Sequence, residues 1–141
     1  MPGFWDASAI LPLCVPVEKP GLSRPLLRQH SPVVWWGTGV EVTSALHRRR
    51  REGILSAQNH EAASRRLVLL RKSWREIQPT NRLRDLAETC LGRHELPAAD
   101  AFQLAAALIW CSEKPKNRAF LCRDLRLRAA AREEGFSILD F

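Results

Sequence analysis

The chain has 141 residues, of which 45% are hydrophobic and 26% are charged, so it is long enough for one domain with a core and too apolar to be disordered. Its net charge of +7 and its pI near 10.1 favour an anionic partner, either nucleic acid or an acidic protein. Arg supplies 18 of the 22 basic residues and Lys the other four, although a general compositional preference for Arg would give the same excess.

The cysteines and the N-terminal apolar stretch exclude several classes of protein. Four cysteines lie at wide, irregular spacings, mostly within apolar runs: Cys14, Cys90, Cys111 and Cys122. They are predicted to be buried thiols in a reducing compartment, not a zinc site or a disulfide framework. The apolar stretch at residues 7–15 follows Asp6 and contains Pro12, so it is not predicted to be a signal peptide. No apolar run has the length of a membrane span, and the protein is expected to be soluble and cytoplasmic.

The first third of the chain is predicted to form two strands and three helices. A short strand at residues 3–5 runs through Asp6 into a helix. Pro and Gly mark a loop over residues 16–25, and a short helix is predicted over 22–30. The β-branched and aromatic residues at 32–36 indicate a second strand. A helix is then expected over residues 38–51, ending before Gly53.

The middle of the chain is predicted to be mostly helical. Ser56 is expected to cap a long helix. Residues 74–77 are predicted to form a short edge strand that Pro79 stops. Apolar residues at helical spacing over 83–90 indicate another helix, ending at Gly92.

The last third contains the strongest helical pattern of the chain, at residues 99–111. A buried strand is predicted over 119–122, a helix over 124–134 closed by Gly135, and a last strand over 136–139. Short apolar strands that alternate with helices predict an α/β fold. In it, a short parallel sheet of about five strands is covered on both faces by helices.

Four acidic residues stand where predicted strands stop or helices begin: Asp6, Glu41, Asp100 and Asp124. Ligands of open α/β sheets bind at the carboxyl ends of the strands, so the four are expected to converge at one edge of the sheet. Carboxylates that cluster without a counter-charge repel one another and raise one another's pKa values. The cluster is therefore predicted to bind a hard divalent cation with oxygen ligands, Mg²⁺ or Mn²⁺.

Helix capping is the alternative explanation for these acids, because a carboxylate at a helix start accepts first-turn N–H groups and suits the helix dipole. Capping explains Asp124 as well as metal ligation does. It is also possible for Glu41 and Asp100, which lie in first helical turns. This structural explanation is weakest for Asp6, because nothing about packing favours an acid inside the apolar segment that it interrupts. Asp6 and Asp100 are therefore predicted to be direct metal ligands, with Glu41 and Asp124 acting through water.

Four segments carry a resemblance to a known family: FWDASAIL at 4–11, VEVTSAL at 40–46, LPAADAFQLAAAL at 96–108 and FLCRD at 120–124. In this order and at these separations they resemble the PIN domain, and within it the VapC-type toxins of prokaryotic toxin-antitoxin pairs. The resemblance covers essentially the whole chain. It implies a single PIN-like domain over residues 1–141 with a three-layer fold.

By this resemblance the four acids are the metal-binding residues, and Ser8 is a polar support beside them. Two positions depart from the family pattern. Cys122 stands where Thr or Ser is usual, and Gln103 stands where His is common. Neither departure removes a charge from the cluster, so metal binding is expected to persist with an altered rate or affinity.

The resemblance implies a Mg²⁺-dependent endoribonuclease that hydrolyses RNA phosphodiester bonds as the toxin of a toxin-antitoxin pair. It also implies a homodimer and a cognate VapB-type antitoxin whose C-terminal segment covers the acidic site. Arg118, Arg123 and Arg126 surround the fourth acid in sequence and are predicted to contact RNA phosphates. The run Arg48–Arg51 is interpreted mainly as a solvated helix end. In a nuclease it could also follow an RNA backbone.

Two other functions are compatible with the sequence. A non-catalytic PIN-like module would bind RNA or protein without cutting, but it would have no reason to tolerate four mutually repelling acids. A phosphatase with an Asp nucleophile would place a second acid two residues after Asp6, where this chain has Ser8. The endoribonuclease is the preferred hypothesis.

The aromatic and imidazole side chains carry weaker signals. Trp35 and Trp36 are adjacent and therefore face opposite sides of a strand, so they are predicted to pack in the core or in a dimer and not to stack on bases. The four histidines show no ligand spacing and are predicted to lie at the surface: His30, His47, His60 and His94.

Overall fold

The computed structural model describes residues 1–15, 23–139 and 141. Within these residues it contains a parallel sheet of five strands with seven helices on its two faces. The predicted α/β fold with a short parallel sheet is confirmed. Most of the predicted loop over residues 16–25 lies outside the described part of the chain. No helix of the described part has both the length and the apolarity needed to cross a bilayer.

The first strand of the chain lies at the centre of the sheet, and later strands are added on both sides of it. Its strands are β1 (Pro2–Trp5), β2 (Ser31–Trp35), β3 (Arg75–Ile77), β4 (Ala119–Leu121) and β5 (Ser137–Leu139). Their order is β3-β2-β1-β4-β5, and every neighbouring pair is parallel. Strands β2 and β3 lie on one side of β1, and β4 and β5 lie on the other. The strand order therefore reverses between β1 and β4, and the carboxyl ends of these two strands form the switch point where such sheets bind ligands.

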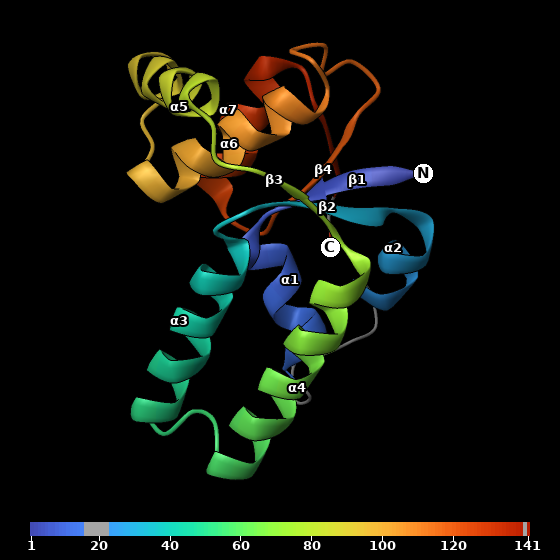
Figure 1. The fold of residues 1–141 in the computed structure, drawn as a ribbon, viewed down its shortest axis with the longest axis vertical. Coiled ribbons are helices and arrows are strands. Elements are labelled where there is room, and N and C mark those ends of the chain that lie inside the picture. Colours follow the sequence, from blue (N-terminus) through green and yellow to red (C-terminus); the bar gives the residue numbers. More distant parts are fainter. Residues whose placement is uncertain (16–22, 140) are drawn as a thin grey trace.

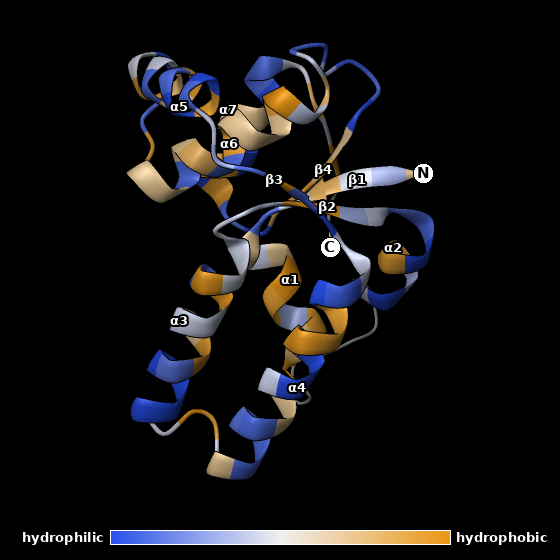
Figure 2. Cartoon of the chain, viewed as in Figure 1, coloured by the Kyte–Doolittle hydropathy of each residue, from blue (hydrophilic) through white to orange (hydrophobic). Residues whose placement is uncertain are grey.

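The helices divide between the two faces of the sheet (Figure 1). One face carries α1 (Ala7–Cys14), α2 (Ser23–Gln29), α3 (Thr38–Arg51) and α4 (Ala57–Ser73). The other carries α5 (Asn81–Arg93), α6 (Ala98–Trp110) and α7 (Leu125–Glu134). Helices α3 and α4 extend away from the sheet, and hydrophilic residues dominate their far ends (Figure 2). The result is a helix–sheet–helix sandwich of three layers.

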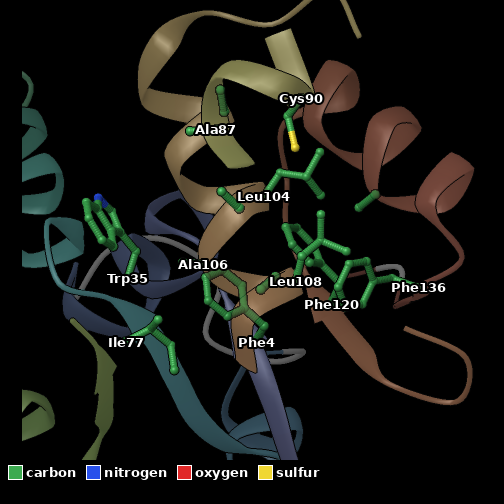
Figure 3. Close-up of a cluster of buried hydrophobic side chains, with 14 of the residues drawn as sticks. Phe4, Trp35, Ile77, Ala87, Cys90, Leu104, Ala106, Leu108, Phe120 and Phe136 are labelled. Carbon is green, nitrogen blue, oxygen red and sulfur yellow. The ribbon is translucent and has the colours of Figure 1, made fainter. Parts of the chain in front are cut away.

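Each face of the sheet has its own apolar core, because successive strand residues point to opposite sides. Phe4 and Phe120 stack with ring centroids 5.4 Å apart in the core beneath α5, α6 and α7 (Figure 3). Trp5 lies in the core on the opposite face, and its indole N–H donates to His30 O at 3.2 Å. The segment before Asp6 is thus buried on both sides, which explains its unbroken apolar character.

Most of the predicted elements and their ends are confirmed. Ser56 caps α4 by accepting a hydrogen bond from Asn59 N at 3.1 Å, and β3 is an edge strand. Gly135 closes α7 with a φ of 112°. Gly92 does not end α5, which continues to Arg93, because nothing at Gly92 imposes a left-handed turn. All four cysteines are buried and free.

The prediction of a surface position is wrong for His94, whose side chain is only 7% exposed. Its Nδ1 lies 3.1 Å from Glu133 Oε2 and its Nε2 lies 2.6 Å from Glu134 Oε2. The imidazole therefore joins the end of α5 to the end of α7. Sequence spacing could not reveal this contact, since the partners are about 40 positions away along the chain.

Candidate metal centre

The structure brings the four acids together around one cavity of about 230 Å³. Asp6 follows β1 and Asp124 lies just beyond β4, two strands that are neighbours in the sheet. The backbone N–H of Asp6 donates to Leu121 O at 3.1 Å, which ties the two strand ends together. Glu41 comes from the first turn of α3 and Asp100 from the first turn of α6. Two acids thus belong to each half of the molecule, on either side of the sheet.

Asp6 caps α1, which the sequence did not lead us to expect. Its Oδ2 accepts from Ser8 N at 3.2 Å and its Oδ1 accepts from Ser8 Oγ at 2.8 Å. Helix capping was expected to explain Asp6 least of the four acids, and the structure shows that it applies here too. Asp6 is nevertheless only 3% exposed. Burial raises its pKa to about 6, the hydrogen bonds from Ser8 and Cys122 oppose the rise, and the charge of Asp100 adds to it.

Ser8 and Cys122 form a polar connection between the start of α1 and the end of β4. Ser8 Oγ accepts from Arg123 N at 2.8 Å while donating to Asp6, and it lies 3.7 Å from Cys122 Sγ. The thiol sulfur in turn accepts from Asp124 N at 3.3 Å. Burial and the nearby charge of Asp6 raise the pKa of Cys122, so the group stays a neutral thiol at physiological pH. It supports the carboxylates without adding a charge.

Gln103 connects α6 to Glu41 in the interior. Its Nε2 donates to Glu41 Oε2 and to Thr38 Oγ1, the latter at 3.1 Å, and the side chain is 1% exposed. Burial raises the pKa of Glu41 to about 7; the hydrogen bond from Gln103 lowers it, whereas the charges of Asp6 and Asp100 raise it. Near neutral pH, Glu41 is therefore divided between its protonated and ionised forms.

Asp100 and Asp124 complete the group. Burial raises the pKa of Asp100, the charge of Asp124 raises it further, and Arg126 opposes the rise. Asp124 Oδ1 accepts from Leu127 N at 2.9 Å, so its predicted capping role is confirmed. Capping uses one oxygen of a carboxylate, and ligation can use the other. The two explanations of this acid are therefore compatible.

The basic residues are arranged differently from the prediction. Arg126 lies close enough to influence Asp100, whereas Arg118 precedes β4 at the opposite end of the strand and stacks over Trp110 at 5.3 Å. Arg118 is thus separated from the acids. Arg48 lines the acidic cavity, although the sequence indicated it only as one member of the run Arg48–Arg51. Its spacing of seven residues from Glu41 puts both on one face of α3, which is the signal that could have found it.

The carboxylate oxygens of the acidic cavity are chemically suited to a hard divalent cation. The cavity supplies carboxylate oxygens, which Mg²⁺ and Mn²⁺ prefer. In the described part of the chain, no three His, Cys, Asp or Glu side chains are close enough to form a closed coordination group. Mg²⁺ does not require one, because proteins commonly hold it by one or two carboxylates together with several waters. Burial is the main cause of the raised pKa values of Asp6, Glu41 and Asp100, and repulsion among the acids adds to it. A bound cation would favour the ionised forms and so oppose both effects.

Comparison with known proteins adds no constraint on the function. No protein-family model matches the chain, and a search of curated proteins finds no significant match. The functional inference therefore depends on the chemistry of the acidic cavity and on its position in the fold.

Proposed function

We propose that the protein is a Mg²⁺-dependent endoribonuclease. The observation that carries this proposal is a single cavity at the switch point of the sheet with four carboxylates contributed by four separate elements. Desolvation and mutual repulsion disfavour their ionised forms, and a bound cation would reverse that preference. The resemblance of the four motif segments to the PIN domain supports the same conclusion.

Asp6 and Asp100 would hold the cation directly, with Glu41 and Asp124 acting through water. Ser8 orients Asp6 by two hydrogen bonds, and Gln103 orients Glu41. When bound, the cation supplies Lewis-acid chemistry, which activates water and offsets negative charge on the phosphate. Mn²⁺ would serve the same set of oxygen ligands.

RNA phosphates would be held by basic side chains at the rim of the cavity. Arg48 lines it, and Arg126 is close to Asp100. Arg123 follows the end of β4, and its backbone already contacts Ser8. The guanidinium fork suits phosphate oxygens, and the net charge of +7 favours association with a polyanion.

The resemblance to VapC-type toxins extends the proposal to partners and compartment. We expect a homodimer in the cytoplasm and a cognate VapB-type antitoxin that covers the acidic cavity. A small DNA-binding protein encoded beside this chain would support the toxin assignment.

The decisive experiment measures cleavage of total RNA by the purified protein with Mg²⁺ and with EDTA. Cleavage should require Mg²⁺ and should be abolished by Asp100→Asn, because the amide lacks the charge that holds the cation. Asp100 is half-buried and makes no cap, so its Asn variant should keep the fold, which circular dichroism checks.

Other outcomes separate the competing functions. RNA binding without metal-dependent turnover would identify a non-catalytic PIN-like binding module. A phosphoenzyme trapped on Asp6 would identify the phosphatase. Cleavage that survives both Asp6→Asn and Asp100→Asn would refute the assignment of the site.

A further inference from the structure

A second cavity lies on the face of the sheet that α5 and α6 cover, and the proposed metal site does not use it. It measures about 310 Å³ and is formed where the end of β2, the first turn of α5 and the first turn of α6 meet. Its apolar side consists of Trp35, Phe102 and Leu83, and its polar side of Thr80, Asn81 and Arg84. Trp35 stands at the edge of the apolar core, away from Phe120 and Phe136 (Figure 3).

Two stacked aromatic rings form one wall of this cavity. Trp35 and Phe102 stack with centroids 5.4 Å apart and ring planes 2° from parallel. The indole also lies across Gly37, where an added Cβ would be 2.6 Å from Trp35 Nε1. Trp36, which is 53% exposed, adds an edge contact to Trp35 at 6.2 Å. Trp35 is in the core as predicted, yet part of it also lines an open cavity.

Several polar groups of the cavity have no hydrogen-bond partner among the residues that the structure describes. Trp35 is 9% exposed, and its indole N–H makes no hydrogen bond with any described residue. Asn81 is exposed, and its side-chain amide has no partner within the described ranges. The nearest acid to Arg84 is Asp85 at 4.0 Å, with both side chains more than 60% exposed, so the guanidinium remains available. These groups are therefore open to a ligand that enters the cavity.

We propose that this cavity binds a nucleobase of single-stranded RNA. An aromatic wall offers stacking to any base, and an amide and an indole N–H offer the donors and acceptor that a base edge requires. Arg84 offers a cation to the adjoining phosphate. A purely apolar anchor from a protein would bury Asn81 and Arg84 without partners, which makes it the poorer occupant.

The inference rests on the proposed function, because it supplies the base next to the phosphate that the acids would cleave. Strand β2, which ends at Trp35, is the neighbour of β1, which leads to Asp6, and parallel strands are about 4.8 Å apart. Phe102 follows Asp100 by two positions in α6, so their side chains leave the helix on different sides. Both cavities therefore lie at the carboxyl edge of the sheet, and a base in the aromatic cavity would belong to the RNA strand whose phosphate reaches the acids. It would contribute to sequence preference.

The test measures binding without cleavage. Fluorescein-labelled single-stranded oligoribonucleotides and an abasic strand of the same length are titrated with the protein in EDTA, and anisotropy gives the Kd. The wild-type protein should bind the strand with bases at least about 5-fold more tightly than the abasic strand. Phe102→Leu and Asn81→Ala should each reduce this ratio and leave the affinity for the abasic strand unchanged. Leu91→Ala, an exposed apolar residue of α5 outside the cavity, is the matched control.

Three results would overturn the inference: no preference for bases in the wild type, an unchanged preference in both cavity variants, or a change of oligomeric mass on substitution. The last would make the cavity an interface between copies of the chain. If Phe102→Leu misfolds, the test uses Asn81→Ala alone, because Asn81 is exposed and its substitution should not disturb the fold. A preference for bases without any cleavage of RNA would refute the nuclease and leave the base site intact.

Discussion

At the scale of single residues, the buried carboxylates make the protein sensitive to pH. Asp6 and Glu41 have pKa values of about 6 and about 7, above their ordinary values of 3.8 and 4.5. Between these limits the folded state binds more protons than the unfolded state. Stability therefore falls as pH rises from about 4 to about 7.

We predict that the metal-free protein is less stable at pH 8 than at pH 5. Asp6→Asn should remove part of this dependence, because the amide still caps α1 and does not ionise. Between pH 5 and pH 8 the shift at Asp6 corresponds to about 1–2 kcal/mol in the free energy of unfolding. Urea denaturation in EDTA at several pH values measures it. Equal pH slopes for the wild type and the variant would contradict the burial of an ionisable Asp6.

Gln103 controls the charge on Glu41, since its hydrogen bond lowers the pKa of that acid. Gln103→Ala should move the rise of RNA cleavage with pH to higher pH. It should also reduce the rate at neutral pH by about 10- to 100-fold, as loss of a group that orients a metal ligand commonly does. Thr38→Val is the control, because it removes the other contact of the Gln103 amide and leaves the one to Glu41. A uniformly lower rate with an unmoved pH profile would indicate a packing role only.

At the scale of helices and strands, the capping residues set where the functional side chains point. Asp6 and Asp124 begin α1 and α7 with a side-chain oxygen on a first-turn N–H. Each helix thus starts directly at the carboxyl end of a central strand. Asp6 follows the last residue of β1 and Asp124 lies three residues beyond β4, and both line the cavity. The site is thus built at secondary-structure boundaries.

Two glycines near helix ends should respond in opposite ways to alanine. Gly135 has a φ of 112°, and a Cβ there would lie 3.2 Å from Pro115, so Gly135→Ala should destabilise the fold by about 1–2 kcal/mol. Gly92 lies inside α5 with open space around it, and Gly92→Ala should stabilise the fold by about 0.5–1 kcal/mol. Urea denaturation of both variants measures the difference. A loss of stability at Gly92 would show that its backbone is not ordinary helix.

At the scale of the whole molecule, the acidic cavity joins the two helical layers. Asp6 and Glu41 belong to elements on the side of α1 and α3, and Asp100 and Asp124 to elements on the side of α6 and α7. A cation held by acids from both sides would link the two layers. Its binding energy would then add to the stability of the whole fold.

We therefore predict that Mg²⁺ stabilises the protein against heat at neutral pH. At a concentration about 100 times the Kd, the gain should be about 2.7 kcal/mol. Asp100→Asn should lose most of the gain, and NaCl of equal ionic strength should not reproduce it. An equal rise of Tm with NaCl would mean that charge screening, and not site binding, is responsible.

The sequence by itself determined the helices and strands and the positions of the acids on them, because these depend on local interactions. Apolar runs and turn residues defined the strands and most helix ends, and parallel strands necessarily present their carboxyl ends at one edge. Asp6 and Asp124 could therefore be expected to meet. Gly92 shows the limit of this reasoning, because a glycine near a helix end need not terminate it.

Tertiary structure alone decided which distant side chains complete each site. It paired Gln103 with Glu41, brought Arg48 to the acids, took Arg118 to the far end of β4 and stacked Trp35 on Phe102. These contacts depend on the strand order and on which helix covers which face. Side-chain periodicity records only whether a residue is buried, and it does not identify the residue buried against it.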